Sequence, residues 1–448
     1  MKILLIMPDS HMHVLRLGSF VRSMREAPLT LTTLAALAPD ELDIEFTLID
    51  EIVSLVPSGQ KFDLVGLSIM TGTADRGYHW AEHFRKLGAA VVIGGVHATI
   101  MPQEASLHAD AVIAGVAERT WPQLLRDFAA GEMKPMYSDH DQATCIDLLP
   151  TPRSDLLKRW RYNVPNSVMA TRGCRHSCEF CSVPAMWKGY HTRPIAHVVD
   201  AIKAMPGSLL GFNDVSLFDD RQYARELMEA ITPLKRKWGA LATADVADDD
   251  DLVDRLAASG CKFLLIGFES LNGKALRGIG KGFNSEQRYR RQIAALQSRG
   301  ITVQGCFIFG FDSDDKTVFD QTVQRVAELK VDIPRYSLFT PYPGTRLFDR
   351  MEAEERIISR NWEDYDTMHV VFRPAKMSPQ ELYDGFRRAY RLTFRMGHII
   401  KRMPGLKLRS VINLVGNLTY KQFVKRLYNE QRFAAPNSAA GEDITCQR

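Results

Sequence analysis

Three cysteines stand close together in Thr171-Arg172-Gly173-Cys174-Arg175-His176-Ser177-Cys178-Glu179-Phe180-Cys181. The other four are dispersed along the chain at Cys145, Cys261, Cys306 and Cys446. Such a tight C-x3-C-x2-C group favours a metal site over a disulfide framework. Three thiolates can hold three irons of a cubane iron–sulfur cluster, which leaves the fourth iron open to a small molecule. The alternative is a zinc site that includes His176, but this residue is cramped between Cys174 and Cys178.

The cysteine group follows the first of six expected strands, which lie mostly about thirty residues apart. These strands are expected at Ser167–Thr171, Leu209–Asp214, Leu241–Asp245, Phe263–Phe268, Thr302–Phe309 and Ile333–Thr340. Amphipathic helical segments fill the gaps between them. Repeated β-α units of this length predict a partial (β/α)6 barrel over residues 167–377, with its chemistry at the carboxyl ends of the strands.

Strands and helices also alternate in the first 140 residues. Short apolar strands are expected at Lys2–Met7, Glu45–Asp50, Asp63–Ile69, Ala90–Gly94 and Asp110–Ala114. Near-continuously apolar strands separated by helices predict a parallel sheet covered on both faces, here a flavodoxin-like, doubly wound α/β domain. Its ligand is expected at the carboxyl ends of the strands, in the loops Ser68–Thr73, Gly94–Thr99 and Gly115–Glu118. Residues 141–166, which hold three prolines, are expected to form a linker.

Length and composition are those of an ordinary folded protein with two or three domains. The chain has 448 residues, of which 45% are apolar and 25% charged, and its net charge is +4. These values exclude wholesale disorder and give no reason to expect nucleic acid as a partner. The sequence contains no apolar run of about 18 residues, the length needed to span a bilayer, and the first eight residues are typical of a strand rather than a signal peptide. We therefore expect a cytoplasmic protein.

Charge is concentrated near the end of the chain, in an expected helical extension over residues 378–448. The segment Arg387–Arg432 contains twelve Lys and Arg residues and one acidic residue, Glu430, so its formal charge is +11 and that of the remainder is −7. The simpler interpretation is a pair of helices with a solvated basic face. The alternative is a surface that contacts anionic lipid headgroups, which would place the protein at the inner face of a membrane.

The cysteine spacing, with Phe180 before the last cysteine, resembles the signature of the radical S-adenosylmethionine (radical SAM) family. The resemblance implies a 4Fe–4S cluster on Cys174, Cys178 and Cys181, with SAM bound to the open iron and cleaved to a 5′-deoxyadenosyl radical. It further implies that SAM is contacted by strand-end residues, which are Phe180, Asn213, Asp214, Glu269, Ser270, Gly305 and Gly310. The sequence departs from the family after the second strand, where Asn213-Asp214 replaces the common Gly-Gly-Glu.

The amino-terminal domain resembles the cobalamin-binding domain that precedes the radical barrel in one large subclass. The similarity rests on Gly94-Gly95-Val96-His97-Ala98-Thr99, Pro102–Ala105, Ala109–Val112, Gly115–Glu118 and Trp121-Pro122. It implies a cobalamin site formed by Ser68, Thr73, Gly94, Gly95, His97, Thr99, Gly115 and Glu118. The Asp-x-His-x-x-Gly pattern of domains that ligate cobalt is not met, because Gly95 and Ile100 occupy the flanking positions. We therefore expect cobalamin without an imidazole ligand from the protein.

The combined resemblance covers about residues 1–395 and implies methylation of an unactivated carbon of a lipid-like, isoprenoid-like or natural-product substrate. The carboxyl-terminal extension resembles that of members acting on lipids and other apolar substrates. The alternative on the same scaffold is a radical cyclisation, ring rearrangement or oxidation without methyl transfer. A non-catalytic cobalamin sensor is disfavoured by the complete cysteine triad. The chemistry also requires a reducing partner such as flavodoxin or ferredoxin.

Overall fold

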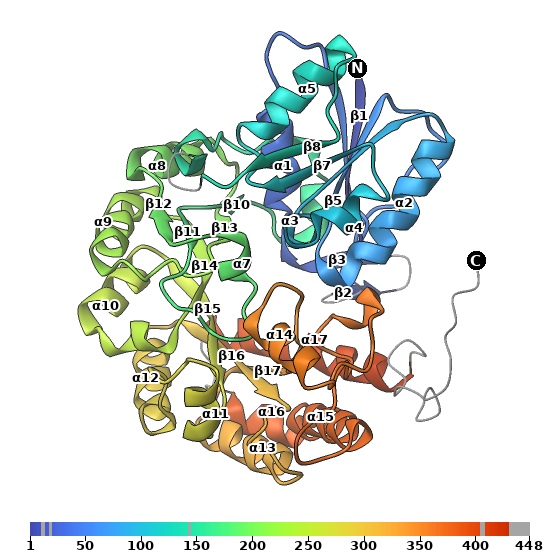
Figure 1. Cartoon of the computed structure of the whole chain (residues 1–448). Helices are drawn as coiled ribbons and strands as arrows, with labels where there is room; N and C mark the ends of the chain where they lie inside the picture. The colour runs from blue at the N-terminus through green and yellow to red at the C-terminus, as the bar shows by residue number, and fades with distance from the viewer. Residues whose placement is uncertain (10–13, 18–19, 142–144, 404–407, 430–448) are drawn as a thin grey trace.

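The computed structural model describes residues 1–9, 14–17, 20–141, 145–403 and 408–429. Two six-stranded parallel sheets dominate it, one in each half of the chain (Figure 1). The first sheet has the order β4(Glu45–Asp50), β1(Lys2–Met7), β5(Leu64–Ser68), β6(Ala90–Gly94), β7(Ala111–Gly115) and β8(Met136–Asp139). The second has the order β10(Ser167–Val168), β13(Leu209–Phe212), β14(Lys237–Ala242), β15(Cys261–Glu269), β16(Thr302–Phe309) and β17(Ile333–Leu338).

The first sheet is covered by helices on both faces, as the apolar strands predict. Along β1, Ile3 and Leu5 pack in the cluster that contains Trp121, whereas Leu4 and Ile6 pack on the other face with Phe84. The covering helices are α1(Leu29–Ala36), α2(Ala74–Lys86), α3(Val96–Ile100), α4(Pro102–Ser106) and α5(Thr120–Ala130). The flavodoxin-like fold is thus confirmed. The sequence pattern does not predict β8, a short edge strand in which only Tyr137 is buried.

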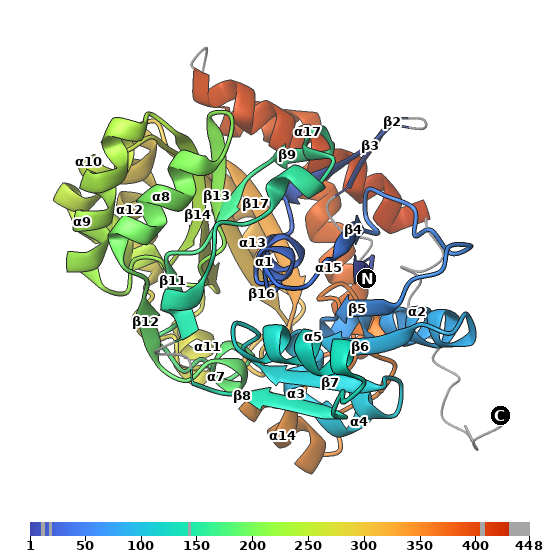
Figure 2. The same cartoon turned by 90° about the horizontal axis from the view of Figure 1, so that it is seen from above.

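The second sheet curves into the partial barrel that the strand spacing predicts, with helices on its outer side (Figure 2). These helices are α8(Ile195–Ala204), α9(Arg221–Ile231), α10(Asp250–Ala258), α11(Gly273–Gly278), α12(Glu286–Ser298) and α13(Val318–Glu328). α14(Arg346–Ala353) follows β17 and contacts Glu179 instead. The third expected strand, Leu241–Asp245, was misplaced. The strand begins at Lys237, because Trp238 supplies the buried anchor of β14 and its ring nitrogen donates to the Ser259 carbonyl at 3.1 Å. Asp245 lies instead in a 3-10 helix, Ala244–Asp248.

The first expected barrel strand, Ser167–Thr171, is divided in two. Only Ser167 and Val168 pair with β13, and the chain then forms β11(Thr171–Gly173), antiparallel to β12(Tyr190–Thr192). Asp214 explains the division, because its buried carboxylate accepts from the backbone N–H groups of Ala170 and Thr171. These groups would otherwise need partners in the sheet.

Residues 145–166 do not behave as an open linker. They contain three short 3-10 helices and β9(Tyr162–Val164), which pairs in parallel with β3(Phe20–Glu26). β3 in turn forms a hairpin with β2(Val14–Leu17). Ile146 and Tyr162 are 1% and 2% exposed. The segment therefore packs against the amino-terminal half, and the domain boundary predicted at residue 140 stays a prediction.

The carboxyl-terminal extension is helical and packs on the barrel. It begins where predicted, because the Ser378 side chain caps α15(Pro379–Thr393) in a capping box with Glu381. α16(Met396–Arg402) and α17(Leu408–Asn429) follow, and α17 lies against β16 and β17. Among the described residues, no helix is both long and apolar enough to span a membrane. The residues beyond 429, including Cys446, lie outside the described part of the chain.

Candidate active site

The cysteine loop runs from β11 to α7(Val183–Met186) and is held by backbone contacts on several sides. The Cys174 N–H donates to the Gly189 carbonyl at 3.2 Å, and the Cys181 N–H donates to the Cys178 carbonyl at 3.2 Å. The Glu179 N–H donates to the Ile279 carbonyl at 3.0 Å. Gly173 has a φ of 85°, and a Cβ there would lie 2.0 Å from the Gly189 carbonyl oxygen, so glycine is required for this close approach.

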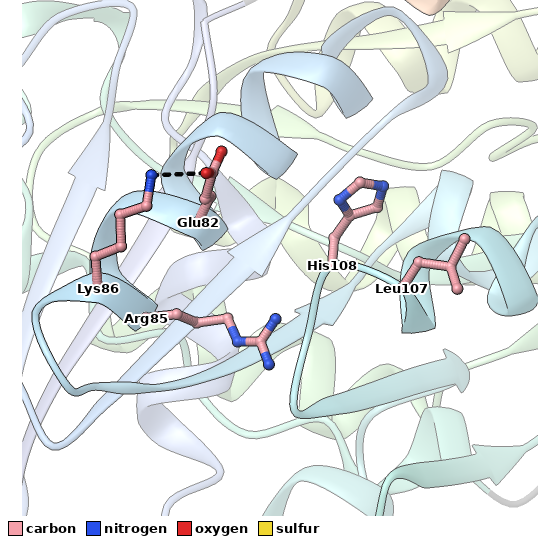
Figure 3. Close-up of a pocket in the computed structure, with 5 residues that line it drawn as sticks. All are labelled: Glu82, Arg85, Lys86, Leu107 and His108. Atoms are coloured by element: carbon pink, nitrogen blue, oxygen red, sulfur yellow. Dashed lines mark hydrogen bonds and ion pairs between the residues drawn. The ribbon is translucent and has the colours of Figure 1, made fainter. Parts of the chain in front are cut away.

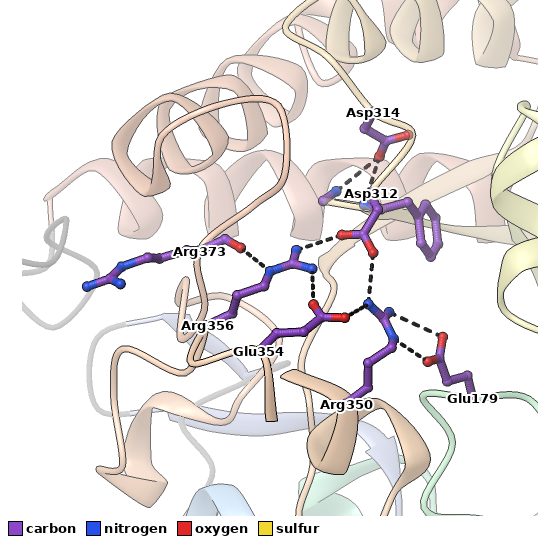
Figure 4. A network of polar contacts seen from close by, with 9 residues as sticks. Glu179, Asp312, Asp314, Arg350, Glu354, Arg356 and Arg373 are labelled. Carbon is purple, nitrogen blue, oxygen red and sulfur yellow. Dashed lines mark hydrogen bonds and ion pairs between the residues drawn. The ribbon is translucent and has the colours of Figure 1, made fainter. Parts of the chain in front are cut away.

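A polar network fixes the middle of the loop from the other side of the barrel mouth (Figure 4). The Arg350 guanidinium on α14 donates to Glu179 at 2.7 Å and to Asp312 at 2.9 Å. Arg356 pairs with Asp312 and with Glu354, at 2.6 and 2.8 Å. Glu179 lies between Cys178 and Phe180, so the network restrains the loop at its centre.

The three thiols fit the thiolate ligands of an iron–sulfur cluster. Cys174, Cys178 and Cys181 are free and only partly buried, whereas Cys261 is buried. Burial raises the pKa of Cys174 to about 11 and also raises the pKa values of Cys178 and Cys181. A thiol in such surroundings becomes a thiolate when a metal binds it.

A site for a single zinc ion is the alternative to a cluster on these cysteines. Among the described residues, no three His, Cys, Asp or Glu side chains converge on a point where one metal ion could bind. A cubane differs, because each of its thiolates binds a different iron. The His176 ring stacks on Phe283 with the centroids 4.0 Å apart.

Glu269 ends β15 in a strained conformation beside the cysteine loop. Its φ is 62°, a left-handed value that costs a non-glycine residue roughly 1–3 kcal/mol. The carboxylate pairs with the ammonium of Lys281 at 2.5 Å, and both side chains are about nine-tenths buried. Burial opposes the charge on Lys281, but Glu269 outweighs it and raises the pKa of the ammonium. Gly267 leaves room for the pair, since a Cβ there would lie 2.2 Å from the Glu269 Oε1 atom.

The other polar and aromatic residues predicted to contact SAM differ in whether they already have partners within the protein. Asn213 has a buried Oδ1 atom with no hydrogen-bond partner in the described part of the chain, which leaves it free to accept from a ligand. Asp214 is occupied by Ala170 and Thr171, and burial raises its pKa to about 7. Phe180 packs edge-to-face with Phe339. Ser270 is buried, and its hydroxyl accepts from the Asn272 N–H at 3.0 Å.

The two predicted glycines of the fifth barrel strand have packing roles. A Cβ at Gly305 would lie 2.8 Å from Val331 and 3.1 Å from the Phe268 ring. Gly310 has a φ of 106°, and its N–H donates to Asp314 at 3.1 Å. Packing thus also requires both glycines, and their contact with SAM stays a prediction.

In the amino-terminal domain, most predicted cobalamin residues meet at the carboxyl ends of adjacent strands. Ser68 ends β5, Gly94 and Gly95 end β6, and Gly115 ends β7. Thr99 joins the last two, because its hydroxyl donates to the Gly95 carbonyl at 2.9 Å and accepts from the Gly115 N–H at 3.0 Å. Gly95 and Gly115 have φ values of 99° and 95°. These loops form one edge of the sheet, where ligands of such folds bind.

His97 and Thr73 point into the protein rather than toward this edge. The buried His97 ring lies 3.1 Å from Glu104 Oε1 and 3.3 Å from Thr71 Oγ1, so both ring nitrogens are engaged. Glu104 also accepts from Trp362, at 2.9 Å. The Thr73 hydroxyl bonds only with the Met70 backbone among the described residues. This arrangement agrees with the expectation that His97 is no cobalt ligand.

Glu118, the last predicted cobalamin residue, joins the two halves of the chain. It forms a short ion pair with Arg172 on β11, two residues before Cys174, and the side chains are 4% and 6% exposed. Glu118 Oε2, Arg172 Nε and Arg172 Nη1 are buried without partners in the described part of the chain. The edge of the first sheet and the cysteine loop therefore face one another across a buried contact that retains free polar atoms.

A surface pocket elsewhere on the amino-terminal domain shares none of these residues (Figure 3). It is lined by Glu82, Arg85, Lys86, Leu107 and His108, and it includes the 2.7 Å ion pair between Glu82 and Lys86.

The site residues that the sequence analysis missed are Arg172, Lys281 and the Glu179–Arg350 pair. Isolated charged residues carry no motif, and their partners are too distant in sequence for any spacing rule to find them.

Comparison with known proteins assigns the family. Residues 2–125 match the B12 binding domain, and residues 168–358 match the radical SAM superfamily. The chain is 31% identical over 416 residues to bacteriochlorophyllide d C-12(1)-methyltransferase of Chlorobaculum tepidum, and the alignment covers 90% of both chains. It is 28% identical to bacteriochlorophyllide d C-8(2)-methyltransferase of the same organism, covering 88% of this chain and 91% of the other.

Solved structures confirm the architecture. The radical S-adenosylmethionine methyltransferase TsrM from Kitasatospora setae, with cobalamin and a [4Fe-4S] cluster bound, superimposes with a TM-score of 0.65 at 17% identity, covering 86% of this chain and 85% of that one. Together with the cysteine loop and the facing sheet edge, these matches show that the chain is a radical SAM enzyme with an amino-terminal B12-binding domain, whose cofactors are a 4Fe–4S cluster, SAM and cobalamin.

Proposed function

We propose that the protein transfers a methyl group to an unactivated carbon of a tetrapyrrole substrate. One observation carries this proposal: the buried Glu118–Arg172 pair joins the cobalamin edge of the first sheet to the strand that leads into Cys174. This contact supports a shared site for both cofactors, which methyl transfer to a carbon radical requires. When bound, the cofactors supply the radical and the methyl group, and the protein supplies position and exclusion of water.

Different residues of the chain bind the cluster, SAM and cobalamin. Cys174, Cys178 and Cys181 hold the cluster, and the Glu179–Arg350 network keeps their loop in place. The free Oδ1 atom of Asn213 would accept a hydrogen bond from the amino group of SAM. Glu269, already fixed by Lys281, presents its second carboxylate oxygen at the same strand ends. Ser68, Gly94, Gly95, Thr99 and Gly115 line the cobalamin edge.

The substrate class rests on the barrel interior and on the relatives. Leu265 and Ile308 alternate with fully buried residues on β15 and β16, and they remain partly exposed in the middle of the protein. An apolar lumen of this kind suits a large, flat, apolar substrate. Two relatives act, by their names, on bacteriochlorophyllide d, which is a tetrapyrrole.

The substrate class is tested by tryptophan-fluorescence titration of the reconstituted enzyme with protoporphyrin IX. We expect saturable quenching at micromolar porphyrin, and in a parallel equilibrium-dialysis assay we expect no comparable binding of a radiolabelled sterol of similar size. Absence of porphyrin binding, with sterol binding instead, would replace a tetrapyrrole with an isoprenoid-like substrate. The electron donor is proposed to be a flavodoxin or ferredoxin, which cluster reduction by either purified protein would support.

We also propose that α17 contacts a membrane surface. Its outward face is apolar, with Val411, Leu414, Val415 and Leu418 between 40% and 60% exposed, while Asn413 and Asn417 on the opposite face are buried. The segment Arg387–Arg432 carries +11. Each cation near an anionic surface contributes roughly 1 kcal/mol, and salt screens this attraction.

The membrane contact is tested with vesicles containing anionic lipid. We expect the full chain to cosediment with them and to dissociate as salt rises. Val411→Glu/Val415→Glu should abolish binding while leaving the melting temperature unchanged, whereas Leu55→Glu, at a 93% exposed site on the amino-terminal domain, should not affect binding. Equal binding by both variants would leave α17 as an ordinary helical cap.

A further inference from the structure

Arg335 is a cation inside the barrel. It lies on β17, in register with Cys306 on β16, and its neighbours Pro334 and Tyr336 are buried on the outer face of the sheet. There the Tyr336 backbone bonds with the Tyr390 hydroxyl of α15, at 2.7 and 3.1 Å. Because side chains alternate along a strand, Arg335 points to the opposite face, into the lumen. Arg335 is partly exposed to solvent, although it lies in the middle of the protein.

The guanidinium has no partner. Across the described residues, Arg335 makes no hydrogen bond and no ion pair, and its Nε atom is buried without an acceptor. The groups that influence its charge are Tyr420, Cys306, Tyr390 and Tyr342. Burial raises the pKa of each of these four groups, so none carries a charge at neutral pH. A charge held largely out of bulk water without a partner is destabilising, and a ligand of opposite charge would relieve that cost.

The carboxylates closest to this environment are already engaged. Glu269, which shares Cys306 as a neighbour with Arg335, is paired with Lys281 at 2.5 Å. Asp366, which shares Tyr342 with Arg335, accepts from the Met368 N–H at 2.7 Å and lies 3.1 Å from the His369 ring. The lumen therefore contains one uncompensated cation with apolar and phenolic surroundings.

We infer that Arg335 binds a carboxylate group of the substrate inside the barrel. The inference rests on the proposed function, because it places the anionic side chain of a tetrapyrrole in the lumen. The planar guanidinium group can donate two parallel hydrogen bonds to one carboxylate. A carboxylate could also come from the methionine part of SAM. The predicted polar SAM contacts Asn213 and Glu269 lie just after β13 and at the end of β15. The predicted contacts on and after β16, Gly305 and Gly310, have no side chain that would pair with a carboxylate, and Arg335, on β17 beyond β16, is assigned to the substrate.

The inference is tested on the reconstituted full-length enzyme with two probes, protoporphyrin IX and its dimethyl ester. We expect wild type to bind the free acid at least about tenfold more tightly than the ester. Arg335→Gln should remove that difference, Arg335→Lys should restore part of it, and the SAM dissociation constant should change less than about twofold. Arg291→Gln, at a 69% exposed side chain on α12, is the matched control and should behave as wild type.

Two further measurements make the result decisive. Arg335→Met should melt at or above the wild-type temperature in the absence of ligand, because it removes an unpaired charge. Sodium benzoate should raise the melting temperature of wild type more than that of Arg335→Met at equal ionic strength. A large fall in stability, with the acid preference intact, would make Arg335 structural and overturn the inference. Loss of SAM affinity alone would assign the carboxylate to SAM. Failure of both porphyrins to bind, with the benzoate effect retained, would overturn the tetrapyrrole class but not the carboxylate role.

Discussion

Removing Arg172 should destabilise the junction between the two halves of the protein. The substitution Arg172→Met leaves the Glu118 carboxylate buried, at 4% exposure, without its cation. Breaking one side of a buried ion pair costs about 3–5 kcal/mol, because the remaining charge has lost both water and partner. For a protein of this size that loss corresponds to a fall in melting temperature of about 3–5 °C.

The assay is thermal unfolding of the full chain, followed by circular dichroism, for wild type, Arg172→Met, Glu118→Leu and the double variant. Replacing both charges with apolar side chains should recover most of the lost stability. The matched control is Arg126→Met, which breaks the exposed Arg126–Glu41 pair of the same residue types and should cost less than about 1 kcal/mol. If Arg172→Met melts like Arg126→Met, or if the double variant is as unstable as the single ones, the buried junction does not have the assigned role.

Three further predictions concern single side chains. Cys174→Ala, Cys178→Ala and Cys181→Ala should each lose iron and SAM cleavage, whereas Cys261→Ala and Cys306→Ala should retain iron near the wild-type content; a full 4Fe–4S spectrum in Cys174→Ala would contradict the ligand assignment. His97→Ala should still bind cobalamin with an unchanged absorption spectrum, because both ring nitrogens of His97 contact protein groups; an imidazole–cobalt signal that disappears in this variant would show the opposite. Burial raises the pKa of Asp214 to about 7, so the folded state retains a proton that the unfolded chain releases, and stability should fall as pH rises from about 4 to 7. Asp214→Asn should flatten this dependence of the melting temperature on pH, and an equal slope in both proteins would refute the assignment.

Local pattern predicted most of the scaffold. β1, β4, β6 and β16 have the expected bounds, because each is a predominantly apolar run. The cysteine loop was located from spacing alone. The divided first barrel strand was missed because its cause is Asp214, more than forty residues away in sequence. β8 and β9 were missed because each is short and gains its stability from a partner strand rather than from its own pattern.

The polar part of the site was harder to predict than the fold. Glu118 and Glu269 were singled out for cofactor contact, but their partners Arg172 and Lys281 were not. A sequence shows that a charge is present, yet its burial and partner depend on tertiary packing. Thr73 and His97 show the converse, since they occupy cofactor loops but turn into the protein. No sequence pattern marked Arg335 as a functional residue. A lone arginine in a strand becomes informative only when the structure shows that its neighbours are uncharged.

The central claim is methyl transfer to carbon by a radical route, and isotope-labelled SAM tests it most directly. The reconstituted enzyme, with a tetrapyrrole substrate, cobalamin, a reductant and SAM carrying a deuterated methyl group, should yield a product in which one CD3 group replaces a hydrogen of the substrate. Each methylation should also release one 5′-deoxyadenosine and one S-adenosylhomocysteine. Release of 5′-deoxyadenosine with a product that carries no label would contradict methyl transfer and would establish cyclisation, rearrangement or oxidation instead.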